Sequence, residues 1–151
     1  MEKEKTPFEK MWERYKECYY RPLELDEKLA ELETRFKTAG AIDYAKVPSE
    51  TSSSMPLPLY YVTYKDEIRK EQAECHDLRI RLKAEIESLI RANIRRDSYA
   101  QIARKKMLDL KTSKVIAAEL GYSEAHVSRI VSECFGILNR VKISTNINKY
   151  Q

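Results

Sequence analysis

The sequence predicts an all-α protein, in which a long N-terminal helical hairpin precedes a C-terminal helix-turn-helix domain. The 151 residues include only 3 glycines and 5 prolines, which is little turn material for a β fold. Apolar residues recur every three or four positions along two long segments, as in amphipathic helices. The spacing within residues 113–130 is that of a helix-turn-helix.

The first long helix is expected over residues 7–39. Its apolar stripe contains Phe8, Trp12, Tyr15, Tyr19, Leu25, Leu29, Leu32 and Phe36. Pro22 also lies in this stripe and has no backbone N–H, so we expect the helix to kink or to restart there. Gly40 is expected to end the helix, because glycine readily adopts the left-handed conformation found at helix ends.

A loop is expected over residues 41–60, since residues 48–58 are rich in serine and proline. A second long helix is then expected from about residue 62 to residue 96. Its apolar stripe contains Tyr61, Tyr64, Ile68, Cys75, Leu78, Leu82, Ile86 and Leu89.

The two long helices would have similar lengths, about 50 and 52 Å. Equal lengths and a connecting loop favour an antiparallel hairpin within one chain. The alternative is a parallel coiled coil with a second chain, which the irregular heptads disfavour. The expected domains are therefore the hairpin, residues 1–96, and the helix-turn-helix domain, residues 97–143, followed by a tail, residues 144–151.

The short helices of the C-terminal domain carry their own start signals. Asp97 and Ser98 are expected to cap a helix that extends to about Leu108, and Thr112 or Ser113 is expected to cap the next one. Hydroxyl and carboxylate side chains suit these positions because they accept hydrogen bonds from the free N–H groups of a first turn.

Residues 113–130 meet the physical requirements of a helix-turn-helix. Ala117 supplies the small residue where the two helices cross, and Gly121 supplies the positive φ of the tight turn. Tyr122 is expected to cover the core from the turn, and Ser123 to cap the second helix. The apolar residues expected to fill the contact are Ile116, Leu120, Val127 and Ile130. A generic helical hairpin closed by glycine is the structural alternative.

The second helix of the motif would present a small and polar face that fits a DNA major groove. The residues of that face are Glu124, Ala125, Ser128, Arg129 and Ser132. Arg129 could pair with guanine and Glu124 could accept from cytosine. The residues expected to meet phosphates are Lys111, Ser113, Lys114 and Ser123. Arg104, Lys105 and Lys106 would extend this basic surface, or would form an ordinary solvated helix face.

Residues 98–140 resemble the C-terminal motif of phage-encoded transcriptional regulators of the RinA and ArpU type, whose DNA-binding part is similar to region four of sigma factors. The resemblance is carried by Lys111-Thr112, Ile116-Ala117, Glu119-Leu120-Gly121-Tyr122-Ser123 and His126-Val127. It implies transcriptional regulation, activation of late phage genes above all, through promoter DNA and RNA polymerase in the cytoplasm of a bacterial host cell.

Charge is distributed unevenly. Residues 98–151 hold 9 Lys/Arg against 4 Asp/Glu, whereas residues 1–97 hold 19 against 20. A basic C-terminal third favours a polyanionic partner, here double-stranded DNA.

The sequence shows no motif of a metal site or an enzyme. The three cysteines have no metal-ligand spacing and are expected to be reduced packing residues. The glycine loops and nucleophile motifs of enzymes are also absent from the sequence. We therefore expect no catalysis, no cofactor, no metal and no membrane segment.

Two other functions compete with regulation. A phage DNA-packaging recognition subunit of the small terminase type also combines a helix-turn-helix with helical parts, although such subunits usually carry the motif near the N-terminus. A protein-interaction module would use the same helices only as core. The oligomeric state is open: a two-fold dimer would bind half-sites about one helical turn apart, and a monomer would bind one asymmetric element.

Overall fold

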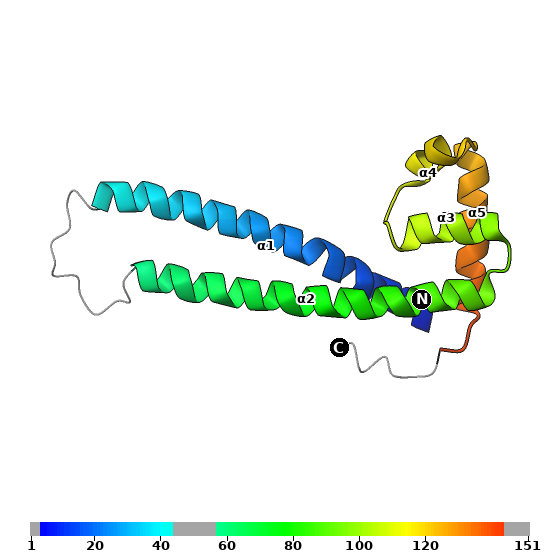
Figure 1. The fold of residues 1–151 in the computed structure, drawn as a ribbon, viewed down its shortest axis with the longest axis horizontal. Coiled ribbons are helices and arrows are strands. Elements are labelled where there is room, and N and C mark those ends of the chain that lie inside the picture. Colours follow the sequence, from blue (N-terminus) through cyan, green and yellow to red (C-terminus); the bar gives the residue numbers. More distant parts are fainter. Residues whose placement is uncertain (1–3, 44–56, 144–151) are drawn as a thin grey trace. The chain divides into compact units, whose positions relative to one another are not determined.

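The computed structural model describes residues 4–43 and 57–143, except the side chains of residues 36–43, 57 and 58. Five α-helices account for most of this part of the chain (Figure 1). Their bounds are Pro7–Asp43 for α1, Leu57–Asn93 for α2, Asp97–Met107 for α3, Ser113–Leu120 for α4 and Glu124–Asn139 for α5. The described residues contain no strand, so the predicted all-α class is confirmed.

The long helices extend further into the expected loop than the sequence predicted. α1 continues through Pro22 without restarting and passes Gly40 to end at Asp43, so the expected stop at Gly40 is wrong. A single glycine inside a helix costs about 1 kcal/mol, which neighbouring residues can offset. α2 begins at Leu57 and ends at Asn93, three residues before the expected end. Residues 41–43 and 57–60 are therefore helical, while residues 44–56 and the tail lie outside the described residues.

The chain packs as two compact units, and the division does not fall at residue 97. We call residues 4–17 and 78–143 the motif unit and residues 18–43 and 57–77 the hairpin unit. Each long helix contributes one segment to each unit. The expected division into a hairpin of residues 1–96 and a separate domain of residues 97–143 therefore differs from the packing.

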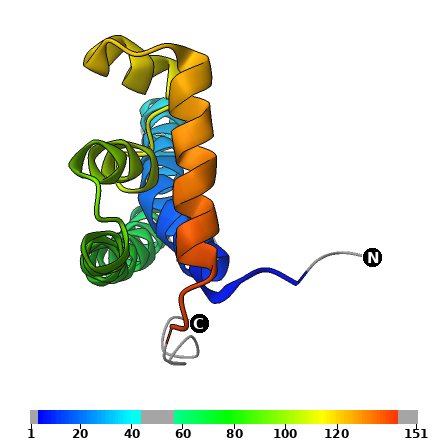
Figure 2. The ribbon, with the colours of Figure 1, turned by 90° about the vertical axis from the view of Figure 1, so that its right-hand side faces the viewer.

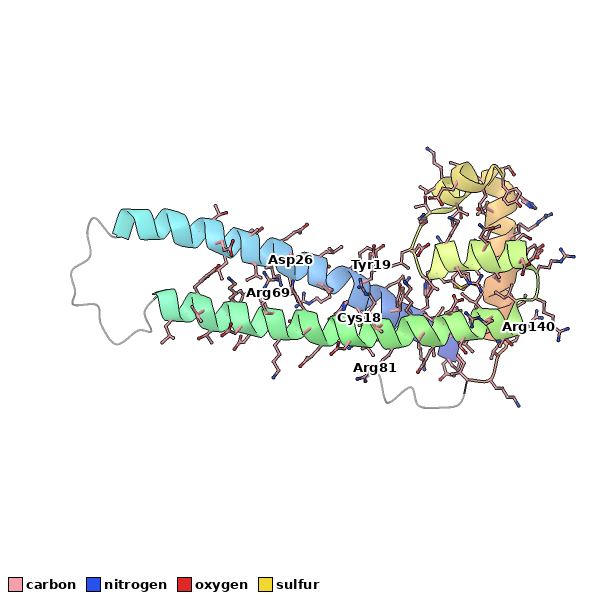
Figure 3. The ribbon with its side chains drawn as sticks, in the orientation of Figure 1. Cys18, Tyr19, Asp26, Arg69, Arg81 and Arg140 are labelled. Carbon is pink, nitrogen blue, oxygen red and sulfur yellow. The ribbon has the colours of Figure 1, made fainter. Side chains whose placement is uncertain are left out.

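The hairpin unit is held by contacts between α1 and α2 of one chain. Leu25, Leu29 and Ile68 are buried together. Figure 3 shows Asp26 and Arg69 pointing toward each other from the two helices, with their charged atoms 3.4 Å apart. These contacts confirm the predicted antiparallel hairpin within one chain.

The motif unit has one core to which all five helices contribute. Its buried residues include Phe8, Met11 and Tyr15 of α1, Leu82, Ile86 and Ile90 of α2, Ile102, Ala103 and Met107 of α3, Ile116 and Ala117 of α4, and Val127, Ile130, Cys134 and Leu138 of α5. Within the unit, α5 packs against α3, and α4 lies near the N-terminal end of α5 (Figure 2). The helix-turn-helix is thus supported by segments from both ends of the sequence.

Candidate nucleic-acid interface

The turn between α4 and α5 has the local geometry that the sequence predicted. Thr112 precedes α4, and its Oγ1 accepts a hydrogen bond from the backbone N–H of Val115 at 3.3 Å. Gly121 has a φ of 74°, in the left-handed region that favours glycine. Ser123 precedes α5, and its Oγ accepts from the N–H of His126 at 3.2 Å. The predicted caps of α4 and α5 and the predicted glycine turn are therefore confirmed.

Two expectations about neighbouring residues are wrong. Neither Asp97 nor Ser98 caps α3, because Arg96 occupies the cap position and Asp97 is already the first helical residue. Tyr122 does not cover the core: 42% of its surface is exposed, and its ring packs edge-on against His126, with 5.2 Å between the ring centroids. Tyr122 therefore packs against a residue in the first turn of α5 and not in the core.

The interior of the helix-turn-helix agrees with the prediction. Ile116 and Val127 are fully buried, and Ala117 and Ile130 are nearly so. Leu120 is partly buried against the same core. With this face of α5 buried, the opposite face is left to solvent.

That opposite face consists of the residues predicted to fit a major groove, of which Glu124, Ala125, Ser128 and Arg129 were predicted to read base edges. All are exposed: Glu124, Ala125, Ser128, Arg129 and Ser132. They occupy the first turns of α5, and most have small side chains that would allow a close approach of the helix to a groove. Arg129 is the long donor among them, and its Nη2 lies 3.0 Å from Nδ1 of His126.

The residues predicted to bind phosphate differ in their availability. Lys114 is exposed and forms no ion pair within the described part of the chain. Ser123 is exposed; its hydroxyl oxygen caps α5, which leaves the O–H free to donate. Ser113 is half-buried at the start of α4. Lys111 is also half-buried, and its Nζ lies 2.7 Å from Oε1 of Glu119.

Glu119 binds two lysines and ties three segments of the motif unit together. Its Oε2 lies 2.6 Å from Nζ of Lys105 on α3, and its Oε1 contacts Lys111 in the connecting loop. Hydrogen bonds from Lys105 and then from Lys111 lower the pKa of the Glu119 carboxyl, and the bond to Glu119 raises the pKa of Lys111. The carboxylate thus neutralises two of the cations that were considered as part of a basic surface.

The other basic residues of α3 are placed differently. Nε of Arg104 donates to both carboxylate oxygens of Glu87, at 2.9 and 3.0 Å, which joins α3 to α2 within the motif unit. Lys106 has no ion pair within residues 4–43 and 57–143. Only Lys106 of the three α3 cations is therefore without an acidic partner there.

Removing the charge of Glu119 should release both of its lysines. We expect Glu119→Gln to raise the affinity for duplexes of unrelated sequence and to steepen the salt dependence of binding by up to about two units, because each freed lysine can displace one counterion. Fluorescence anisotropy over a series of salt concentrations measures both effects. Glu133→Gln is the matched control, since Glu133 is an exposed carboxylate of α5 without an ion pair among the described residues. Equal changes in the two variants would contradict this role of Glu119.

No protein-family model, curated protein or solved structure matches the chain. The resemblance of residues 98–140 to phage regulators therefore stays a prediction.

The supporting residues that sequence reasoning missed lie at the start of α1. Nε1 of Trp12 donates to the carbonyl of Met107 at 2.9 Å, and the hydroxyl of Tyr15 donates to the carbonyl of Leu108 at 2.5 Å. Met107 is the last residue of α3 and Leu108 is its C-cap, so both carbonyls belong to the helix end, where C=O groups lack partners within the helix. Trp12 and Tyr15 thus fix the end of α3 just before the loop that leads into α4.

The start of α1 is itself fixed to the end of α5. Thr6 and Glu9 cap each other reciprocally: the backbone N–H of Glu9 donates to Thr6 Oγ1, and that of Thr6 to Glu9 Oε2. Thr6 Oγ1 also donates to Oδ1 of Asn139 at 2.7 Å. The sequence Thr6-Pro7-Phe8-Glu9 is a readable capping signal, but nothing in it indicates the contact with Asn139.

The described residues contain no group of three or more His, Cys, Asp or Glu side chains that could hold a metal ion. The three cysteines are reduced, and burial raises the pKa of Cys134 to about 11, so that thiol stays protonated as a packing group. None of the helices in residues 4–43 and 57–143 is long and apolar enough to cross a membrane.

Proposed function

We propose that this protein is a sequence-specific DNA-binding transcriptional regulator that places α5 in the major groove. The observation that carries the proposal is the exposed face of α5, which begins at a serine cap two residues after a left-handed glycine. Small side chains surround one long donor, Arg129, at the N-terminal end of that face. This is the arrangement in which a recognition helix reads base edges.

The roles follow from the positions of the side chains. Arg129 recognises guanine, and Glu124 accepts from cytosine. Lys114 and the hydroxyl of Ser123, both exposed at the N-terminal ends of the motif helices, contact phosphates. Lys111 contributes less than the sequence suggested, because Glu119 holds it.

The biological setting of the proposal comes from the family resemblance. A regulator of the RinA and ArpU type would act in the cytoplasm of a bacterial host cell, activate late phage genes and contact RNA polymerase. The hairpin unit, which supplies none of the DNA-contacting residues, is then available for the polymerase or for a second copy.

The test begins with duplexes enriched from a random pool by the purified protein. Arg129→Ala should weaken binding to the enriched duplex by about 1–3 kcal/mol and relax its sequence preference, because one bidentate base contact is lost. Lys114→Ala should weaken enriched and unrelated duplexes equally and flatten the salt slope by about one unit. Fluorescence anisotropy at several salt concentrations measures both quantities.

Lys70→Ala is the matched control, because Lys70 is an exposed lysine of α2 in the hairpin unit. It should leave affinity and salt slope unchanged. Binding that is unchanged in Arg129→Ala and Lys114→Ala would overturn the assignment of α5 to the groove. Failure of the wild-type protein to enrich any duplex at low salt would overturn DNA binding itself and favour a protein-interaction module.

A further inference from the structure

Arg129 does not stand alone on the exposed face of α5, because a histidine one turn earlier contacts its guanidinium. Nη2 of Arg129 and Nδ1 of His126 are 3.0 Å apart. A guanidinium can only donate hydrogen bonds, so Nδ1 has to be the acceptor. The contact therefore requires a neutral His126 whose ring proton is on Nε2.

The ring of His126 is in turn placed by its neighbours. Tyr122 packs edge-on against it, with the two ring planes inclined by 69°. The backbone N–H of His126 is fixed by the cap from Ser123. The cap from Ser123 and the ring of Tyr122 thus fix His126, and His126 in turn holds the guanidinium of Arg129. These contacts reduce the conformational freedom of the arginine side chain before it binds a base.

No other charged group among the described residues forms an ion pair with His126 or Arg129. The remaining charged side chains on the elements of the motif are Asp97, Arg104, Lys105 and Lys106 on α3, Asp109 and Lys111 in the next loop, Lys114 and Glu119 on α4, and Glu124 and Glu133 on α5. None of them forms an ion pair with His126 or Arg129 in the part of the chain that the structure describes. Glu119 is occupied by its two lysines, so its carboxylate is not available to a protonated His126.

We propose that neutral His126 positions Arg129 for base recognition, and that protonation of His126 lowers the sequence discrimination of the protein. This inference rests on the proposed function and names the residue that orients its main base contact. When His126 is protonated, Nδ1 becomes a donor and two cations face each other, so the guanidinium is released. The added positive charge near DNA would meanwhile strengthen binding to any sequence. Acid should therefore bring the affinities for specific and nonspecific DNA closer together.

The experiment compares the affinity for the duplex enriched by the wild-type protein with that for a scrambled duplex of the same composition. Between about pH 8 and about pH 5.5, where imidazoles change charge, the wild-type ratio should fall by about five- to tenfold. His126→Gln should keep the ratio that the wild type shows at the higher pH throughout, because the glutamine oxygen can accept from Arg129 and does not titrate. His126→Ala should show a low ratio at both pH values.

Two further variants separate positioning from other effects. Arg129→Ala should show a low ratio that does not change with pH. His76→Gln removes the only other histidine, an exposed residue of the hairpin unit, and should behave like the wild type. Circular dichroism should show the same helix content in all variants at both pH values.

Two results would overturn the positioning role alone: the same pH dependence in His126→Gln as in the wild type, or full discrimination by His126→Ala. If the wild-type protein enriches no duplex, both this inference and the proposed function are wrong. The two failures are therefore distinguishable, because the first leaves enrichment by the wild-type protein intact.

Discussion

Replacing Phe8 with alanine is expected to destabilise the motif unit by about 3–5 kcal/mol, the usual cost of truncating a fully buried phenylalanine. Phe8 is completely buried in the core that contains α3, α4 and α5, and its ring centroid lies 6.0 Å from that of Phe135 on α5. Because a domain of this size has only about 5–15 kcal/mol of stability, the variant should lose much of its DNA binding as well.

Thermal unfolding followed by circular dichroism measures the loss, and hydrogen exchange of the α5 amides locates it. Tyr20→Ala is the matched control, since Tyr20 is an aromatic residue of the same helix with 47% of its surface exposed. That variant should change stability by less than about 0.5 kcal/mol. If Phe8→Ala left the exchange of α5 unchanged, the start of α1 would not belong to the motif unit.

Gly121→Val is expected to cost about 2 kcal/mol and to abolish DNA binding, because valine is strongly disfavoured at positive φ. The cost comes from the backbone alone: an added Cβ at Gly121 would meet no atom within 4 Å. Relief of the strain requires a different turn, and a different turn changes the angle between α4 and α5. Chemical denaturation and binding to the enriched duplex measure the two effects.

Gly136→Val provides the comparison, because Gly136 lies inside α5 and its added Cβ would also meet no atom within 4 Å. Valine is a better helix former than glycine, so this variant should match or slightly exceed the wild-type stability. Gly121→Asn should lose less than Gly121→Val, since asparagine tolerates the left-handed region. Equal stability of Gly121→Val and the wild type would contradict the strained turn.

The structure also changes which parts of the chain Gly121→Val should spare. The sequence predicts that residues 1–96 form a domain separate from the motif, which the variant would spare. The motif unit includes residues 4–17 and 78–93, so these ends should loosen together with α4 and α5. The hairpin unit has its own buried cluster of Leu25, Leu29 and Ile68 and should keep its helices.

The features that were predicted correctly are those encoded by neighbouring residues. Thr112, Gly121 and Ser123 each act within three or four positions of themselves, through a cap or a permitted φ, so their roles can be read from local sequence. The exposed face of α5 follows from the burial of Val127 and Ile130 by helical periodicity.

The features that were missed depend on residues far apart in the sequence. A helical stripe that contains Phe8 and Trp12 shows that a face is buried but not which partner buries it. Trp12 packs edge-on against Phe135, with ring centroids 4.9 Å apart, and no spacing in the sequence signals that contact. The pairing of Lys111 with Glu119 was missed for a related reason: a charge count cannot tell a cation that faces solvent from one that is neutralised in the fold.

The bond between Thr6 and Asn139 joins residues separated by 133 positions, and it has a consequence for synthesis on the ribosome. A core closed by its first and last helices cannot form until nearly all of the chain has been translated. The hairpin unit, whose cluster lies between residues 25 and 68, can assemble earlier. Such nonlocal closure slows folding and leaves the apolar start of α1 exposed during translation. The single tryptophan, Trp12, lies where α1 contacts the end of α3, so its fluorescence would report when this late contact forms.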